Sequence, residues 1–319
     1  MFLSLLFFLL SVTPSSSSPD NLSFDFYSRS CPDVERIVKD AVRTRAGLDP
    51  SVTGKLLRLV FHDCMVEGCD GSVLLEGDES ERSDPANASL GGFPVVEGIK
   101  RLLEVFCPGT VSCADILALA SRDAVELAGG PSVRIPLGRR DGRVSAVSNV
   151  RINTVDTSFT LDQMAQIFSS KGLTIDDLVT LSGAHTIGVA HCSAFSDRFK
   201  EGPHGKLTPI DPSLNESYAA QLSRECPSAS STTVVSNDPQ TSLVFDNQYY
   251  RNLLVGKGLF QSDSALFSDD RTKEKVEVFS GDQDGFFRSW GQSFVKLTAV
   301  GVKTGEEGEI RRSCERVNG

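Results

Sequence analysis

Arg58 and His62, one helical turn apart, are the first candidates for chemistry in this 319-residue chain. They lie in the stretch Arg-Leu-Val-Phe-His-Asp-Cys, residues 58–64. On a helix, side chains four residues apart share a face. A guanidinium beside an imidazole keeps the imidazole neutral and able to accept a proton, and it can also stabilise charge that develops on an oxygen substrate. A half-buried histidine packed against an arginine, without a chemical role, explains these two residues equally well.

A second candidate is His185, in Leu-Ser-Gly-Ala-His-Thr-Ile-Gly, residues 181–188. It follows a predicted helix at 174–181 and lies between two glycines, where a flat ligand can approach closely. Taken alone, a histidine on an apolar face is more often a core residue than a ligand. The chain has four histidines, and we assign no role to His191 and His204, which lie in more polar surroundings.

The loop at residues 63–72 is rich in oxygen ligands. It carries Asp63, Asp70 and Ser72, several free carbonyls, and a glycine between two cysteines. Calcium prefers such oxygen cages, although the spacing here is not that of an EF-hand. A polar loop closed by a small disulfide is the alternative interpretation.

The segments that must position these residues are mostly helical by hydrophobic periodicity. A capping box begins the segment at Thr160, and residues 113–128 are apolar nearly all round, as in a central buried helix. Strand signals are few and short, the best being at 133–135 and at Ile310. The sequence therefore predicts a mainly α fold. The predicted helices are 32–42, 52–63, 113–128, 160–172, 174–181, 213–225, 247–255, 272–279 and 285–299.

Composition and the N-terminus limit the function classes. The net charge of -10 argues against nucleic acid as a partner, and it disfavours an anionic membrane face or polyanion as the main ligand. Residues 1–12 are apolar, too short to span a membrane, and typical of a signal peptide. We expect a signal peptide at 1–18 and a single secreted domain at 19–319, with no membrane span. A buried terminal helix is the alternative for the apolar run.

Eight cysteines remain after such a cleavage, and an even count in a secreted chain favours four disulfides. The count leaves their pairing open. No CxxC pair is present, which argues against a zinc site. Glycosylation sequons begin at Asn21, Asn87 and Asn215.

Residues 58–64 and 181–188 resemble the distal and proximal haem motifs of the class III, secretory plant-type peroxidases. The similarity runs from residues 24–32 to 312–314, which is nearly the whole mature chain, and includes family-like stretches at 111–115, 136–141 and 245–250. It implies the haem peroxidase fold, in which two helical lobes, distal and proximal, enclose haem b.

The resemblance also implies a division of labour. His185 corresponds to the histidine that ligates the haem iron, and Asp263 to the carboxylate that accepts its second ring N–H. His62 would take a proton from hydrogen peroxide and return it to the leaving oxygen, while Arg58 stabilises the charge and Phe61 lines the distal pocket. Small phenolic donors would then be oxidised in successive one-electron steps.

Asn87 fits the asparagine that supports the distal histidine in this family, and Glu81 fits the glutamate that holds the asparagine. We therefore do not expect a glycan on Asn87, and keep Asn21 and Asn215 as candidates. The family also binds two Ca²⁺ and has four disulfides. The first calcium site corresponds to Asp63, Val66, Gly68, Asp70 and Ser72, the second to Thr186, Asp238, Thr241, Val244 and Asp246, and the disulfides to Cys31–Cys107, Cys64–Cys69, Cys113–Cys314 and Cys192–Cys226.

The chain departs from the family pattern around the expected substrate edge, at Val155, Gly91 and Val133, which puts donor preference in doubt but not the turnover of peroxide. We assign Val155 to that edge. We expect a monomer in the cell wall or apoplast. The alternatives are a haem-binding homologue with a non-catalytic wall or signalling role, a secreted hydrolase using Cys64 with His62, and an intracellular ascorbate-type peroxidase. The signal segment and the cysteines disfavour the last.

Overall fold

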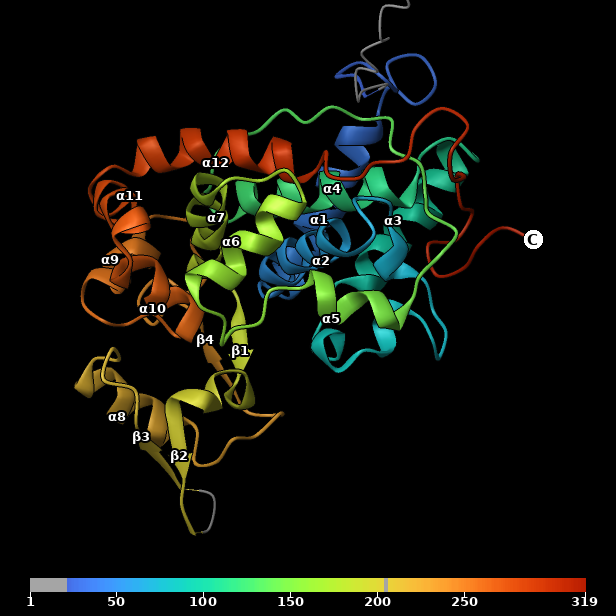
Figure 1. The fold of residues 1–319 in the computed structure, drawn as a ribbon. Helices are drawn as coiled ribbons and strands as arrows, with labels where there is room; N and C mark the ends of the chain where they lie inside the picture. Colours follow the sequence, from blue (N-terminus) through green and yellow to red (C-terminus); the bar gives the residue numbers. More distant parts are fainter. Residues whose placement is uncertain (1–21, 204–205) are drawn as a thin grey trace, which may run out of the picture.

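The computed structural model describes residues 22–203 and 206–319. The predicted signal peptide, Asn21 and His204 lie outside the described residues. Helices dominate the ribbon in Figure 1, as the sequence predicts. Among the described residues, no helix is both long and apolar enough to cross a membrane.

One lobe consists of four helices, three of which pack against the fourth. They are α1 (Val34–Leu48), α2 (Val52–Val66), α3 (Phe93–Phe106) and α4 (Cys113–Leu127). Every residue of α4 from Cys113 to Val125 is buried, and α4 packs against the other three. Its nearly continuous apolar surface explains this central position. The helix that carries Arg58 and His62, α2, packs most extensively on α4.

The other lobe lies at the opposite side of the molecule in Figure 1, and its helices α6 and α7 are on the side that faces the first lobe. An edge-to-face aromatic contact between Tyr250 and Phe286, with ring centroids 5.0 Å apart, joins two of its helices. This second lobe contains six helices, which are α6 (Leu161–Ser170), α7 (Ile175–Ser182), α9 (Gln248–Leu254), α10 (Gln261–Ser268), α11 (Asp270–Gly281) and α12 (Gln283–Leu297). The shorter elements are α5 (Val150–Asn153), α8 (Glu216–Glu225), and the 3₁₀ turns η1 (Ser72–Leu74), η2 (Glu81–Ser83), η3 (Pro85–Asn87), η4 (Val147–Asn149), η5 (Gly183–Thr186) and η6 (Cys192–Arg198).

The strands form two small antiparallel pairs. β1 (Val189–His191) pairs with β4 (Val234–Ser236), and β2 (Phe199–Glu201) pairs with β3 (Leu207–Pro209). Together with α8, the second pair extends away from the main body in Figure 1. The strands predicted at 133–135 and at Ile310 are wrong. Neither segment pairs with a partner strand among the described residues, and only isolated bridges form beside them, at Leu137 and Glu309.

Four disulfides join the cysteines in the pairing that the resemblance implies. Cys113–Cys314 ties the start of α4 to the C-terminal segment, and Cys64–Cys69 closes the loop after α2. No cysteine is left free. The hydrolase alternative needs a free thiol at Cys64 and is therefore wrong.

Asp177 connects α7, which leads to His185, with α12. It forms the capping box of α7 with Thr174, and it accepts hydrogen bonds from Ser293 Oγ (2.8 Å) and Lys296 Nζ (3.0 Å) on α12. Burial alone would raise the pKa of Asp177, but these hydrogen bonds outweigh it and lower the pKa to about 2.

Because the folded pKa of Asp177 lies below its ordinary value of 3.8, this carboxylate stabilises the fold above about pH 4 and loses its effect as the pH falls towards 2. We expect Asp177→Asn to lower the free energy of unfolding by about 1–2 kcal/mol at pH 7. The difference from the wild type should narrow between pH 5 and pH 2.5 in denaturant titrations. Asp176→Asn, on the same helix but exposed, should change stability by less than about 0.5 kcal/mol. A difference for Asp177→Asn that does not depend on pH would contradict the assignment.

Candidate functional site

His62 is held in one neutral tautomer by two neighbours. Arg58 Nε, which is always a donor, lies 3.2 Å from His62 Nε2, so that nitrogen carries no proton. The other ring nitrogen, Nδ1, lies 2.7 Å from Asn87 Oδ1 and donates to it. Arg58 and His62 share one face of α2, as their spacing predicts. The arrangement leaves Nε2 as the basic atom.

The electrostatic environment of His62 keeps it neutral. Its side chain is only 5% exposed. Burial first, and then the positive charge of Arg58, lower the pKa of His62 to about 3, although the hydrogen bond to Asn87 opposes them. At any pH near neutrality this imidazole is therefore an acceptor for a proton.

Asn87 uses both ends of its amide. Its oxygen accepts from His62, and its Nδ2 donates to the main-chain carbonyl of Glu81 at 2.8 Å. Glu81 thus holds Asn87 through its backbone. The Glu81 side chain accepts from Ser145 Oγ at 3.4 Å, and its second carboxylate oxygen is buried without a hydrogen bond. A buried asparagine with both ends engaged has no free nitrogen for a glycan.

Two neighbours of His62, Arg58 and Phe61, are less buried than His62 itself. Neighbouring protein groups exclude water from part of the Arg58 guanidinium, and this desolvation lowers its pKa. The residue as a whole is nevertheless exposed to solvent. Phe61 is half-buried, with its ring edge towards His62 at 6.1 Å between centroids. Buried surroundings with an accessible surface are what a ligand pocket requires.

His185 lies in η5, directly after α7, and is paired with a buried acid. Its Nδ1 lies 2.8 Å from Oδ1 of Asp263, which is 2% exposed. Burial would raise the pKa of Asp263, but the adjacent His185 and donors from Phe260 N and Tyr249 OH outweigh it and lower the pKa. An ionised carboxylate only accepts, so His185 donates its Nδ1–H.

The donor set around His185 fits the axial ligand of a haem iron. With Nδ1–H engaged by Asp263, the lone pair on Nε2 is free, and Nε2 has no hydrogen-bond partner in the described part of the chain. The His185 side chain is 36% exposed although Asp263 behind it is buried. A histidine with one nitrogen fixed by a carboxylate and the other free towards open space is the usual form of a metal ligand.

A close backbone contact joins the helix of His62 to the segment of His185. A Cβ added to Gly54, on α2, would lie 2.8 Å from the Cα of Gly188. Gly188 itself has a φ of 95°, which L-side chains rarely adopt. Gly188 is three residues after His185, and His62 is about 12 Å further along α2 from Gly54. The two glycines therefore set the distance between the two candidate halves of the site.

The second predicted calcium set converges in the structure. Thr186 Oγ1 lies 3.0 Å from Asp246 Oδ1 and 3.4 Å from the Val244 carbonyl. Thr241 Oγ1 lies 3.2 Å from both Asp238 Oδ2 and Asp246 Oδ1. Within the described ranges, neither carboxylate has a basic side-chain nitrogen within 4.0 Å. Two uncompensated carboxylates among hydroxyls and a carbonyl fit a calcium ion.

The first predicted calcium set is also brought together around the loop after α2. Asp63 accepts from the Gly71 and Val73 amides, and Asp70 accepts from the Ser72 amide at 3.0 Å. Ser72 Oγ is buried without a hydrogen-bond partner within 3.5 Å among the described residues, and it lies close enough to the Glu81 carboxylate to lower the pKa of that group against the effect of burial. Burial and the neighbouring Asp70 and Glu81 carboxylates raise the pKa of Asp63.

Basic side chains lie close to this first set. Lys303 Nζ is 2.5 Å from Asp70 Oδ2, and Lys171 Nζ is 3.0 Å from the Val66 carbonyl. The Gly68 carbonyl accepts from the Asp70 amide. The described residues contain no group of three or more His, Cys, Asp or Glu suited to a metal. Each predicted calcium set has only two carboxylates, so this finding does not test either of them.

Comparison with known proteins identifies the fold and the chemistry together. A family model described as "Peroxidase" matches residues 34–282. The chain belongs to the peroxidase family. It is 62% identical over 319 residues to Peroxidase 18 of Arabidopsis thaliana, covering 99% of this chain and 96% of that one. It is 59% identical to Peroxidase 46 of the same plant (99% and 96% covered) and 44% identical to Peroxidase 5 of Vitis vinifera (99% and 97%).

Membership of the peroxidase family confirms several of the predictions made from the sequence. The resemblance to plant peroxidases and the mainly α peroxidase fold are confirmed. The chain is an enzyme with peroxidase function, which uses hydrogen peroxide and a reducing donor, and the plant peroxidase family is haem-dependent. The roles of individual residues in this peroxidase remain predictions.

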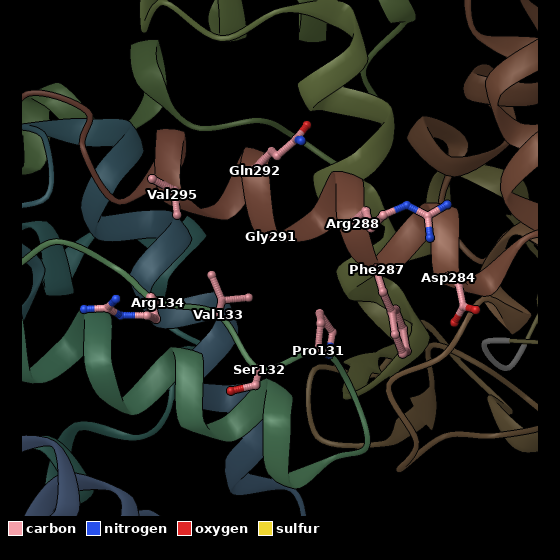
Figure 2. A pocket seen from close by; sticks show the side chains of 10 residues that line it. All are labelled: Pro131, Ser132, Val133, Arg134, Asp284, Phe287, Arg288, Gly291, Gln292 and Val295. Atoms are coloured by element: carbon pink, nitrogen blue, oxygen red, sulfur yellow. The ribbon is translucent and has the colours of Figure 1, made fainter. Parts of the chain in front are cut away.

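The three departures from the family pattern lie in different places. Val155 is half-buried against the main core, and Gly91 lies beside the Lys55 side chain. Val133 lines a surface groove of about 730 Å³ between residues 131–134 and α12, where it points towards Gly291 (Figure 2). None of the residues assigned to haem, peroxide or calcium lines this groove. The expectation that Val133 belongs to the same edge as the donor site is therefore not supported by its position.

One residue of the site, Tyr249, is not predicted by the sequence. Its hydroxyl lies 2.8 Å from Asp263 Oδ1. The stretch 245–250 resembles the family, but two tyrosines are adjacent in it, and nothing in their spacing shows which of them reaches Asp263. That information exists only in the packing of α9 against the start of α10.

We expect Gly54→Ala to destabilise the protein by about 1–3 kcal/mol, because the added Cβ meets the backbone of Gly188 rather than a side chain that can move. The fraction of Gly54→Ala protein that keeps its haem through gel filtration should also be lower than for the wild type. Gly98→Ala is the matched control, since Gly98 lies inside α3 with nothing within 4 Å, and this change should be neutral or stabilising. Equal effects of the two substitutions would show that the contact is not tight.

We further expect calcium to raise the melting temperature of the chelator-treated protein, because it neutralises the paired carboxylates around Thr186. Asp246→Asn should reduce this calcium-dependent rise by at least half. Asp284→Asn, an exposed control on α12, should leave it unchanged. The measurement is a thermal melt against calcium concentration, and an undiminished rise in Asp246→Asn would remove Asp246 from the site.

Proposed function

We propose that this peroxidase holds haem b through His185, reduces hydrogen peroxide with His62 and Arg58, and oxidises small phenolic donors in one-electron steps. One observation carries the proposal: two buried hydrogen-bond networks fix the two histidines in complementary states. His62 presents an unprotonated Nε2 next to a guanidinium. His185 presents a free Nε2 backed by a carboxylate.

The proton transfer follows from the bonds at His62. Peroxide would displace the Arg58 Nε–H from His62 Nε2 and give a proton to that nitrogen. Arg58, released from the imidazole, would then donate to the oxygen on which charge develops. His62 returns the proton to the other oxygen, which leaves as water. Asn87 keeps the remaining ring proton on Nδ1, so that Nε2 is the atom that exchanges it.

The proximal residues set the properties of the iron ligand. The Asp263 carboxylate accepts a hydrogen bond from the His185 Nδ1–H, and this bond raises the basicity of the imidazole. When bound, haem supplies the redox chemistry that stores the oxidising equivalents of peroxide until the donors reduce it. Thr186, next to His185 in the chain, would link this ligand to the second calcium ion.

The proposal also includes the location of the protein, its glycosylation and its cofactors. Four disulfides are typical of oxidising compartments, which supports secretion to the cell wall or apoplast and disfavours an intracellular ascorbate-type peroxidase. Asn215 remains the candidate for a glycan within the described residues, and its side-chain oxygen caps α8. Two Ca²⁺, a monomeric state and phenolic donors are part of the proposal.

The alternative is a homologue that binds haem but serves a non-catalytic role in the wall or in signalling. The complete networks around both histidines disfavour it. An assay of the calcium-loaded holoprotein with hydrogen peroxide and guaiacol tests the point. Absence of peroxide-dependent oxidation would overturn the proposed function.

Substitution of each histidine separates their roles. We expect His62→Ala to keep a haem absorption band but to lower the rate constant for reaction with peroxide by about 10²–10⁴-fold, as for loss of a general acid–base group. His185→Ala should instead weaken haem retention. His191→Ala is the control, since His191 contacts neither network. Identical behaviour of the first two variants would contradict the division of labour.

A further inference from the structure

Oδ1 of Asp263 is shared by two donors. It accepts the His185 Nδ1–H at 2.8 Å and the Tyr249 hydroxyl at 2.8 Å, while Oδ2 accepts the Phe260 amide at 2.9 Å. Asp263 is 2% exposed, and within the described residues no lysine or arginine lies within 4.0 Å of it. The charge of this carboxylate is therefore divided among three dipolar donors.

Tyr249 is firmly placed to act on Asp263. It is 3% exposed, on α9, and its ring meets the His185 ring edge-on with centroids 5.9 Å apart. Its other flank packs edge-on against Tyr250 at 5.1 Å. The phenol has no exposed alternative position, so its hydroxyl stays on the same oxygen that His185 uses.

We propose that Tyr249 is a positioning residue that limits how strongly Asp263 pulls on the proton of His185. The inference rests on the proposed function in one respect, that His185 ligates the haem iron. By donating to Oδ1, the phenol withdraws charge from the oxygen that faces His185. The imidazole then has less anionic character than a carboxylate held by His185 alone would give it.

The expected change in the basicity of the His185 imidazole follows from the small number of hydrogen-bond donors on Asp263. Hydrogen bonds to charged groups are roughly twice as strong as those between neutral groups, and they are strengthened further in a buried site. Without the Tyr249 hydroxyl, Oδ1 keeps only His185 as its donor. The carboxylate then becomes a stronger acceptor, and a more basic imidazole stabilises ferric over ferrous iron.

Tyr250 provides a matched control. It is the next residue of α9, is fully buried, and differs in where its hydroxyl goes. The Tyr250 hydroxyl donates to the carbonyls of Val179 (3.0 Å) and Thr180 (3.2 Å) on α7, not to Asp263. Tyr250→Phe therefore removes the same atom, one residue away, without changing the donors on Asp263.

The experiment uses the holoprotein with calcium. The ferric–ferrous reduction potential is measured by spectroelectrochemistry, and the iron–histidine stretching band of the ferrous form by resonance Raman. For Tyr249→Phe we expect a shift towards the ferric form of three- to tenfold in the equilibrium ratio, tenfold being 59 mV for one electron. The iron–histidine band should move to higher frequency. Tyr250→Phe should leave both at their wild-type values.

A double-mutant cycle adds a second test. In an Asp263→Asn background, whose neutral amide exerts little pull on His185, adding Tyr249→Phe should no longer shift the potential. An unchanged potential in Tyr249→Phe, a shift of opposite sign, or an equal shift in Tyr250→Phe would overturn the inference. Absence of an iron–histidine band from the wild type would overturn the assignment of His185, and this inference with it. That outcome is distinguishable because it does not involve Tyr249.

Discussion

The proximal half of the molecule depends on one buried negative charge, the carboxylate of Asp263. Taking an ion out of water is expensive unless donors replace the solvent, and here the donors are His185, Tyr249 and the Phe260 amide. They come from η5, from α9 and from the residue before α10. These three segments must converge on one point for the charge to be tolerated. The same convergence fixes the tautomer of His185, so one set of contacts supports the buried charge and orients the ring that we propose as the iron ligand.

The distal half uses the opposite sign of charge. Arg58 and burial keep His62 unprotonated, whereas Asp263 holds a proton on the facing nitrogen of His185. Two chemically identical side chains thus differ in function because one has a cationic neighbour and the other an anionic one. Asn87 completes the contrast. Its neutral amide oxygen accepts a hydrogen bond from His62 Nδ1–H, and it adds no negative charge that would make the ring a stronger base.

Local patterns in the sequence predict the distal features better than the proximal ones. The spacing of Arg58 and His62 on a helix, the oxygen-rich loop at 63–72, and most helices follow from periodicity. The contact between His185 and Asp263 spans 78 residues, and only the family resemblance indicates it. Helix α10, which carries Asp263, was not predicted, because its short sequence has little periodicity. The strand expected at 133–135 was wrong because β-propensity cannot form a ladder where no partner strand lies alongside.

Both histidines are followed directly in the chain by a residue of a proposed cation site, Asp63 after His62 and Thr186 after His185. On a helix, consecutive residues point about 100° apart, so Asp63 and His62 point to different sides of α2, although both are buried. A cation bound beside Asp63 or Thr186 would therefore restrain the backbone of the neighbouring histidine without touching its ring. The hydrogen bonds of Asp263 and Asn87 would then need only to orient the rings. This separation would let the ring nitrogens exchange protons or bind iron while the backbone beneath them stays in place.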